Sequence, residues 1–213
     1  MFKKGTWGFL LCVLSILLTS CIPPAAEQKP AAYTVTDIEG TAVDFPAPPK
    51  RIVTLSMSTD EVMLGLVEPA RIAAVNSLLD DPVSSNVTGL VKEIPQRIGN
   101  PTVEEIMALH PDLVVVPDWG DLTMVPSLRE AGLKVVVCKG ARNLAEIRET
   151  ITLLAAAAGV PERGEKLLSM MDGKLDEIQE KVAKIPQDER KRVVLISLMG
   201  GYGGLGSSFD EAC

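Results

Sequence analysis

The stretch "DLVVVPDWGDLTMVPSLREAGLKVVVC" (residues 112–138) decides the fold. It begins and ends with a short apolar run and places a helical pattern, ending at LREAG, between them. Strands that are apolar on both faces are typical of a sheet covered by helices on both sides. Two such strands joined by a helix run parallel, with a right-handed crossover. The stretch therefore predicts an α/β fold built on a parallel sheet.

The alternation of strands and helices continues upstream of this unit. Short apolar strands are predicted at 51–55 and 71–75, and Ser58–Glu61 reads as a capping box for the helix between them. The two β-rich runs of "YTVTDIEGTAVDFP" (33–46) predict a hairpin around Glu39-Gly40. Between the second strand and Gly99 no element is defined by the sequence.

Further helices follow the same order. A second capping box, Thr102–Glu105, opens a short helix that stops at His110-Pro111, and another helix is predicted from Asn143 to Gly159. Residues 33–160 therefore form one α/β lobe.

A long helix is predicted over 161–185, with proline at its first position. At 1.5 Å per residue it would span roughly 36 Å, the width of a domain, and we interpret it as a strut between two bodies. Residues 186–213 begin with the strand "RVVLISL" and a glycine-rich turn. So short a segment cannot bury a core of its own, so we expect it to be the start of an incomplete second α/β lobe.

The N-terminus predicts export and lipidation. Residues 1–20 contain Lys3, Lys4 and an apolar segment too short to span a bilayer comfortably, which is typical of a signal peptide. "LTSC", ending at Cys21, is similar to the bacterial lipobox, and residues 21–32 read as a flexible tether. We expect a diacylated Cys21 and a location outside the cytoplasm, on a membrane. The alternative is a plain secretory signal in which Cys21 is incidental.

Net charge and cysteine content argue against a nucleic-acid partner and against a disulfide framework. The formal net charge is −7 and becomes more negative when the two signal lysines are removed, so nucleic acid is not expected as a partner. Of the cysteines outside the signal and lipobox, Cys138 follows an apolar run and Cys213 is the last residue. A disulfide framework is not supported, and Cys138 is interpreted as a small buried hydrophobic residue.

The order of these segments carries a family resemblance. Lipobox, tether and hairpin are followed by "PPKRIVTLSMSTDEVMLGL", "IGNPTVEEIMALHPDLVVV", "LREAGLKVVV" and the long helix. This order resembles the iron-siderophore, haem and vitamin B12 class of ABC-transporter solute-binding proteins. The resemblance implies two Rossmann-like lobes joined by one rigid helix, with ligand bound between them. It implies a monomer without enzymatic activity or cofactor, whose partners are a permease and ATPase subunits and whose ligand is a ferric siderophore, haem or cobalamin.

The resemblance also implies a binding site at the ends of the strands. Open α/β sheets bind ligands beyond the carboxyl ends of their strands, which agrees with that location. Met57 stands where the family often has proline, and Trp119 has the alternative of packing only on its own loop. The candidate ligand-binding residues are Ser56, Met57, Ser58, Asn76, Ser77, Leu78, Asn100, Asp118 and Trp119.

Glu104 matches the glutamate with which the first lobe of this family docks onto arginines of the permease. Its alternative role is that of a first-turn acid favoured by the helix dipole. The matching glutamate of the second lobe would lie beyond Cys213.

Other functions are disfavoured by the sequence. Gly201–Gly206 spells G-x-G-x-x-G, but a dinucleotide site needs an acid about twenty residues later, and Ser207 stands where a Walker loop needs lysine. A zinc- or manganese-binding importer component remains an alternative, although the chain has one histidine, His110, at a helix end. An exported enzyme is less favoured, because no G-x-S-x-G or H-E-x-x-H motif is present.

Overall fold

The computed structural model describes residues 32–191. The predicted signal peptide, lipidation at Cys21, most of the tether, the glycine-rich turn and most of the predicted second lobe lie outside these residues.

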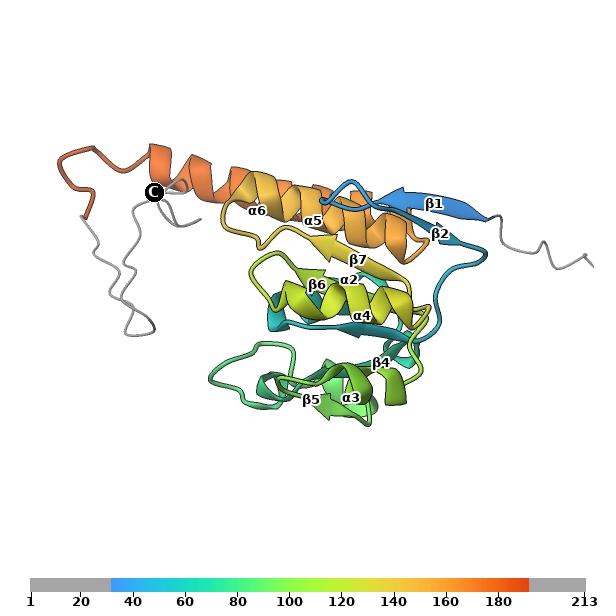
Figure 1. Ribbon diagram of the computed structural model, residues 1–213. Helices are drawn as coiled ribbons and strands as arrows, with labels where there is room; N and C mark the ends of the chain where they lie inside the picture. Colours follow the sequence, from blue (N-terminus) through green and yellow to red (C-terminus); the bar gives the residue numbers. More distant parts are fainter. Residues whose placement is uncertain (1–31, 192–213) are drawn as a thin grey trace, which may run out of the picture.

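A five-stranded parallel sheet forms the centre of the described part (Figure 1). Its spatial order is β5-β4-β3-β6-β7. The predicted α/β fold with a parallel sheet is therefore confirmed. The strands are β3 (Ile52–Thr54), β4 (Ile72–Asn76), β5 (Arg97–Ile98), β6 (Leu113–Pro117) and β7 (Val135–Cys138).

Helices cover both faces of the sheet, as the apolar strands predicted. Along β6, Leu113 and Val115 belong to one core cluster, whereas Val114 and Val116 belong to the other. The first cluster packs beneath α2 (Met57–Leu66), α5 (Leu144–Ala157) and α6 (Pro161–Ala183), and the second beneath α3 (Val103–Ala108) and α4 (Val125–Glu130). Short 3-10 helices are η1 (Pro69–Arg71), η2 (Ser77–Asp80), η3 (Leu90–Glu93) and η4 (Leu122–Met124).

The start of α2 differs from the predicted capping box. Ser56 is the N-cap, and its hydroxyl oxygen accepts a hydrogen bond from the Thr59 backbone N–H at 3.3 Å. The helix thus begins before Ser58, which is exposed on its first turn. The sequence offers hydroxyl side chains at 56, 58 and 59, and the end of β3 at Thr54 selects the first of them.

The start of α3 follows the prediction. The Glu105 N–H donates to the Thr102 hydroxyl at 3.2 Å, and the Glu105 carboxylate accepts from the Thr102 N–H at 2.8 Å. This reciprocal pair is a capping box. The chain leaves α3 through His110, which has a φ of 47°.

The predicted hairpin is also present and lies against the β7 edge of the sheet. β1 (Tyr33–Thr36) pairs antiparallel with β2 (Ala42–Phe45). The Ile38 N–H donates to the Val137 carbonyl at 3.2 Å, and Arg129 from α4 forms an ion pair with Asp37 at 2.8 Å. These contacts join the hairpin to the lobe.

The long helix predicted over 161–185 is α6. It packs closely on α5 because Gly164 leaves no side chain at the crossing, where a Cβ atom would lie 2.5 Å from the Ala155 Cβ. Beyond this crossing α6 extends past the end of the sheet (Figure 1). Along residues 32–191 no helix is both long and apolar enough to cross a bilayer.

Candidate functional site

The strand order changes direction at β3, which makes one edge of the sheet a topological switch point. From β3 the chain moves to β4 on one side, and β6 and β7 lie on the other. The loops that follow β3 and β6 therefore diverge, and such switch points are where open α/β sheets bind ligands. The edge formed by the loops that follow the five strands is called the carboxyl edge below. Asn76 is the last residue of β4, and the other eight residues predicted to bind ligand lie in or directly after these loops.

The three predicted residues in the turn after β3 differ in how far their side chains are exposed. Ser56 is buried, and its hydroxyl group is used in capping α2. Met57 is partly buried and packs against the core, whereas the Ser58 side chain is exposed. Of these three predicted residues, Ser58 is therefore the one whose side chain is most open to a ligand.

A buried carboxylate supports this turn from below. Asp60, in α2, accepts a hydrogen bond from the Thr54 hydroxyl and another from the Asn76 N–H, the latter at 2.8 Å. It thereby ties the ends of β3 and β4 to the same helix. Burial raises the pKa of Asp60 to about 7, although both hydrogen bonds and the more distant Arg97 act in the opposite direction. Sequence reasoning missed this residue, because its partners come together only through the sheet.

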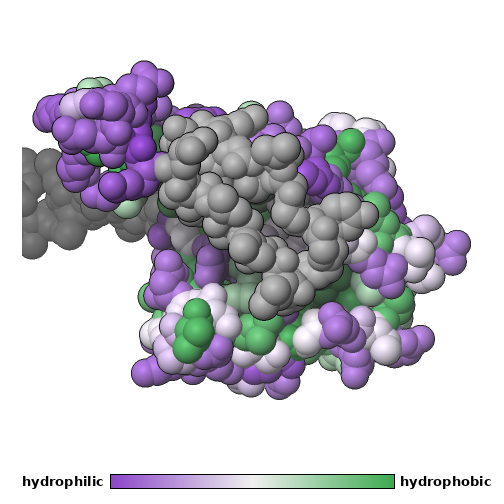
Figure 2. Space-filling view, turned by 90° about the vertical axis from the view of Figure 1, so that its left-hand side faces the viewer, coloured by the Kyte–Doolittle hydropathy of each residue, from purple (hydrophilic) through white to green (hydrophobic). Residues whose placement is uncertain are grey.

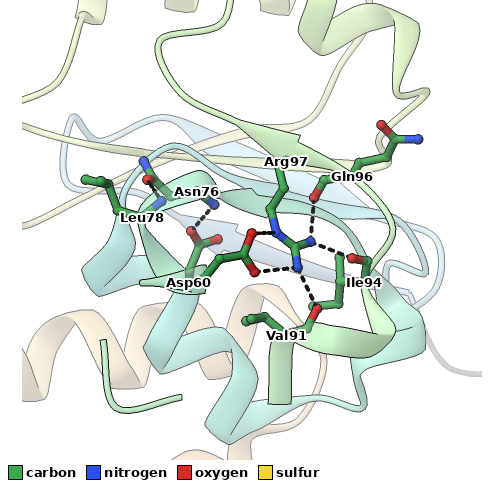
Figure 3. A network of polar contacts seen from close by, with 8 residues as sticks. Asp60, Asn76, Leu78, Val91, Ile94, Gln96 and Arg97 are labelled. Carbon is green, nitrogen blue, oxygen red and sulfur yellow. Dashed lines mark hydrogen bonds and ion pairs between the residues drawn. The ribbon is translucent and has the colours of Figure 1, made fainter. Parts of the chain in front are cut away.

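The segment after β4 is held by a polar network (Figure 3). The Asn76 side-chain oxygen accepts from the Leu78 N–H at 2.9 Å and caps η2. The Arg97 guanidinium forms a bidentate ion pair with Asp80, with N–O distances of 2.7 and 2.8 Å. It also donates to the backbone carbonyls of Val91, Ile94 and Gln96.

Because of this network, the side chains at the tip of the segment point outward. Ser77 is exposed, and the Leu78 side chain is 52% exposed. The role of Arg97 could not be seen in the sequence, where the segment before Gly99 has no clear pattern.

The turn after β6 carries the aromatic candidate. The Gly120 N–H donates to the Pro117 carbonyl at 2.9 Å, so Asp118 and Trp119 form the middle of a tight turn. Asp118 is half-buried and accepts from the Arg142 guanidinium at 2.8 Å. Trp119 is 58% exposed.

A mostly apolar cavity of about 390 Å³ lies beside the turn after β3. Its polar lining includes Ser58, Glu61 and Lys139, and most of its apolar lining comes from α2, α5 and α6. Figure 2 views the molecule from the side toward which the strands run, and apolar residues lie among hydrophilic ones on the part of this face that is visible. The cavity is lined by Ser58, Thr59, Glu61, Val62, Lys139, Ala141, Ile147, Thr150, Ile151, Leu167 and Met171.

The remaining predicted residues follow β5. Asn100 is exposed and lines a separate cavity of about 360 Å³ together with Glu105. It is therefore on the carboxyl edge but does not share the cavity that Ser58 lines. Glu104 is exposed on the first turn of α3, as either of its two predicted roles requires.

Two further predictions concern reactive and metal-binding groups. Cys138 is fully buried and free, and burial raises the pKa of its thiol to about 12, which confirms its interpretation as a core residue. Between residues 32 and 191 no group of three or more His, Cys, Asp and Glu side chains could hold a metal ion. His110 is exposed and precedes β6, at the end of the sheet opposite to the carboxyl edge.

Two curated relatives align with most of the chain. It is 28% identical over 206 residues to the uncharacterized ABC transporter substrate-binding lipoprotein YvrC of Bacillus subtilis, covering 91% of this chain and 63% of the relative. It is 26% identical over 190 residues to a cobalamin-binding protein of Halobacterium salinarum, covering 79% and 51%. The chain thus spans between half and two thirds of the length of these relatives.

A solved structure has the same fold. The molybdate-bound MolA of Haemophilus influenzae superposes with a TM-score of 0.62 at 20% identity, over 75% of this chain and 56% of MolA. The family model described as periplasmic binding protein matches residues 52–211, well over half of the sequence. The family expected from the sequence is confirmed, and the chain belongs to the periplasmic binding protein family.

Proposed function

We propose that this chain is the ligand-capturing lobe of an extracytoplasmic solute-binding lipoprotein of an ABC importer. Its ligand is an iron complex, either a siderophore or haem, or cobalamin. The protein performs no chemistry itself, since it binds the ligand and delivers it to a permease whose ATPase subunits supply the energy. Cys21 carries the lipid anchor, and Glu104 contacts the permease.

One observation carries this proposal. The residues predicted to line the cleft follow four different strands, and the fold brings all of them to one edge. At that edge an exposed indole and an exposed leucine lie on segments held by polar contacts, and a mostly apolar cavity lies beside the turn after β3. A mostly apolar cavity with an exposed indole and a few fixed polar groups at the same edge suits a large organic metal complex better than a small bare ion.

The class of the relatives supports the same reading. The Halobacterium relative is described as cobalamin-binding, and the Bacillus relative as a substrate-binding lipoprotein of an ABC transporter. The first description agrees with a large ligand, and the second agrees with a membrane anchor at Cys21.

The proposal is tested by calorimetric titration of the full-length, unlipidated protein. The probes are cyanocobalamin, haemin and ferrioxamine, with zinc, manganese and molybdate as controls. Saturable binding of one large complex, with no heat from the controls, is the expected result. A response to zinc or manganese alone would overturn the proposal and favour the metal-importer alternative, and a response to molybdate alone would favour an oxyanion importer.

A further inference from the structure

The turn after β6 presents Trp119 in a defined direction. Asp118 and Trp119 are the middle residues of the turn closed by the Gly120-to-Pro117 hydrogen bond of 2.9 Å. The Asp118 N–H donates to the Cys138 carbonyl at 2.9 Å, which ties the start of this turn to the end of β7. The indole therefore leaves the turn toward the neighbouring β7–α5 loop.

That loop meets the indole at a glycine. A Cβ atom at Gly140 would lie 2.4 Å from the Trp119 Cδ1 and 2.8 Å from an Asp118 carboxylate oxygen. A Cβ atom at that place would push the Trp119 and Asp118 side chains aside, because packed atoms do not approach so closely. Gly140 does not have the positive φ found at Gly132 and Gly159, so the requirement for glycine comes from space.

The β7–α5 loop is itself fixed on both sides of Gly140. Before it, the Lys139 carbonyl accepts from the Thr150 hydroxyl at 3.2 Å. After it, Arg142 forms ion pairs with Asp118 at 2.8 Å and with Glu146 at 3.3 Å. The two loops therefore behave as one unit, with the indole held against the Gly140 backbone and more than half of its surface open.

We propose that the β7–α5 loop is part of the ligand site, and that Gly140 is a positioning residue that orients Trp119 to pack its open face on the ligand. The inference rests on the proposed function, since it names how that site holds its aromatic contact. Nothing in the sequence motifs points to Gly140, because α4 and β7 separate it from Trp119 in the chain.

A double-mutant cycle tests the coupling in the full-length protein. The dissociation constants for cyanocobalamin, haemin and ferrioxamine are measured for wild type, Trp119→Ala, Gly140→Ala and the double variant. Trp119→Ala is expected to weaken binding about tenfold and Gly140→Ala about fivefold, the range in which a well-oriented aromatic contact contributes. In the Trp119→Ala background, Gly140→Ala is expected to change the dissociation constant by less than about twofold.

Two further variants complete the test. Gly173→Ala is the matched control, because no atom lies within 4 Å of a Cβ placed there, and it should leave binding unchanged. Should Gly140→Ala fail to fold, Arg142→Ala takes its place in the cycle, since it releases Asp118 without adding an atom. Acrylamide quenching of the Trp119 fluorescence, obtained by subtraction of a Trp119→Phe spectrum, should increase in either variant before any ligand is added.

The outcomes separate this inference from the proposed function. Wild type that binds none of the probes would overturn both. Wild type that binds while Gly140→Ala and Arg142→Ala bind equally well would overturn the positioning role alone. The same conclusion would follow if either variant weakened binding to the same extent with and without Trp119.

Discussion

Replacement of Asp60 by Asn should change how stability depends on pH. Asp60 is fully buried under the ends of β3 and β4, and burial raises its pKa to about 7 from an ordinary value near 4. The folded state therefore binds a proton more tightly than the unfolded state does. The stabilisation that follows is fully present below about pH 4 and is lost as the pH rises toward 7.

The magnitude follows from the size of the shift. A difference of about three pKa units corresponds to roughly 4 kcal/mol, spread over the same window at about 1.4 kcal/mol per pH unit. In Asp60→Asn the amide oxygen can accept from the Asn76 N–H and the amide nitrogen can donate to the Thr54 hydroxyl, so the variant imitates the protonated acid. The charged groups that act on the Asp60 carboxyl, Glu61 and Arg97, are unchanged in this variant.

Urea unfolding of wild type and Asp60→Asn at several pH values between 4 and 8 measures the effect. The variant should gain stability relative to wild type as the pH rises, by several kcal/mol at pH 8, and the difference should disappear near pH 4. Asp60→Ala is the control: it leaves the Thr54 and Asn76 groups without a partner and, because it does not titrate either, should be less stable than Asp60→Asn by about 1–3 kcal/mol per group at every pH. Parallel pH profiles for wild type and Asp60→Asn would refute the raised pKa.

Three other changes test the lobe and its proposed partner. Glu104→Ala in the full-length protein should reduce uptake in cells and leave the ligand dissociation constant unchanged, whereas a loss of affinity would mean that this glutamate belongs to the ligand site. Gly164→Ala should lower the free energy of unfolding by about 1–3 kcal/mol, because its Cβ would lie 2.5 Å from that of Ala155. The control Gly173→Ala, on an open face of the same helix, should raise the free energy of unfolding by up to about 1 kcal/mol. Equal effects of the two substitutions would contradict the close crossing. The Cys138 thiol is buried and has a pKa of about 12, so it should resist alkylation at pH 8 in the native protein and react after unfolding. Mass spectrometry follows the reaction, and rapid alkylation of the native protein would contradict the burial of this thiol.

Local signals in the sequence predicted most elements of the lobe. The apolar runs before Cys138 and Pro117 indicated buried strands, and the spacing of Thr102 and Glu105 indicated a capping box, because each signal depends on neighbours in the chain. The short strand β5 was not predicted, since its two residues form a strand through pairing with Val75 and Asn76, which are distant in the chain. The cap of α2 was misplaced for a related reason, because three nearby hydroxyl residues satisfy the local rule and only the position of β3 selects Ser56.

The candidate site likewise contains residues that could be predicted from the sequence and residues that could not. Its location followed from the general rule that ligands bind at the carboxyl ends of parallel strands, so Trp119 and Asn76 could be named in advance. Asp60, Arg97 and Gly140 could not, because most of their partners lie 6 to 22 residues away in the chain and meet them only in the folded lobe. The residues that face outward were therefore easier to predict than those that hold them in place.

The attachment of α6 has a mechanical consequence. The helix is fixed to the lobe by its tight crossing at Gly164 and, further along, by the ion pair between Arg148 and Asp172. From Asp172 to its end at Ala183 it overhangs by roughly 16 Å, at about 1.5 Å per residue. A small change in the angle of α6 at this crossing therefore moves the far end of the helix by a larger distance. The close packing of Gly164 against Ala155 therefore fixes the angle at which the far end of α6 leaves the lobe.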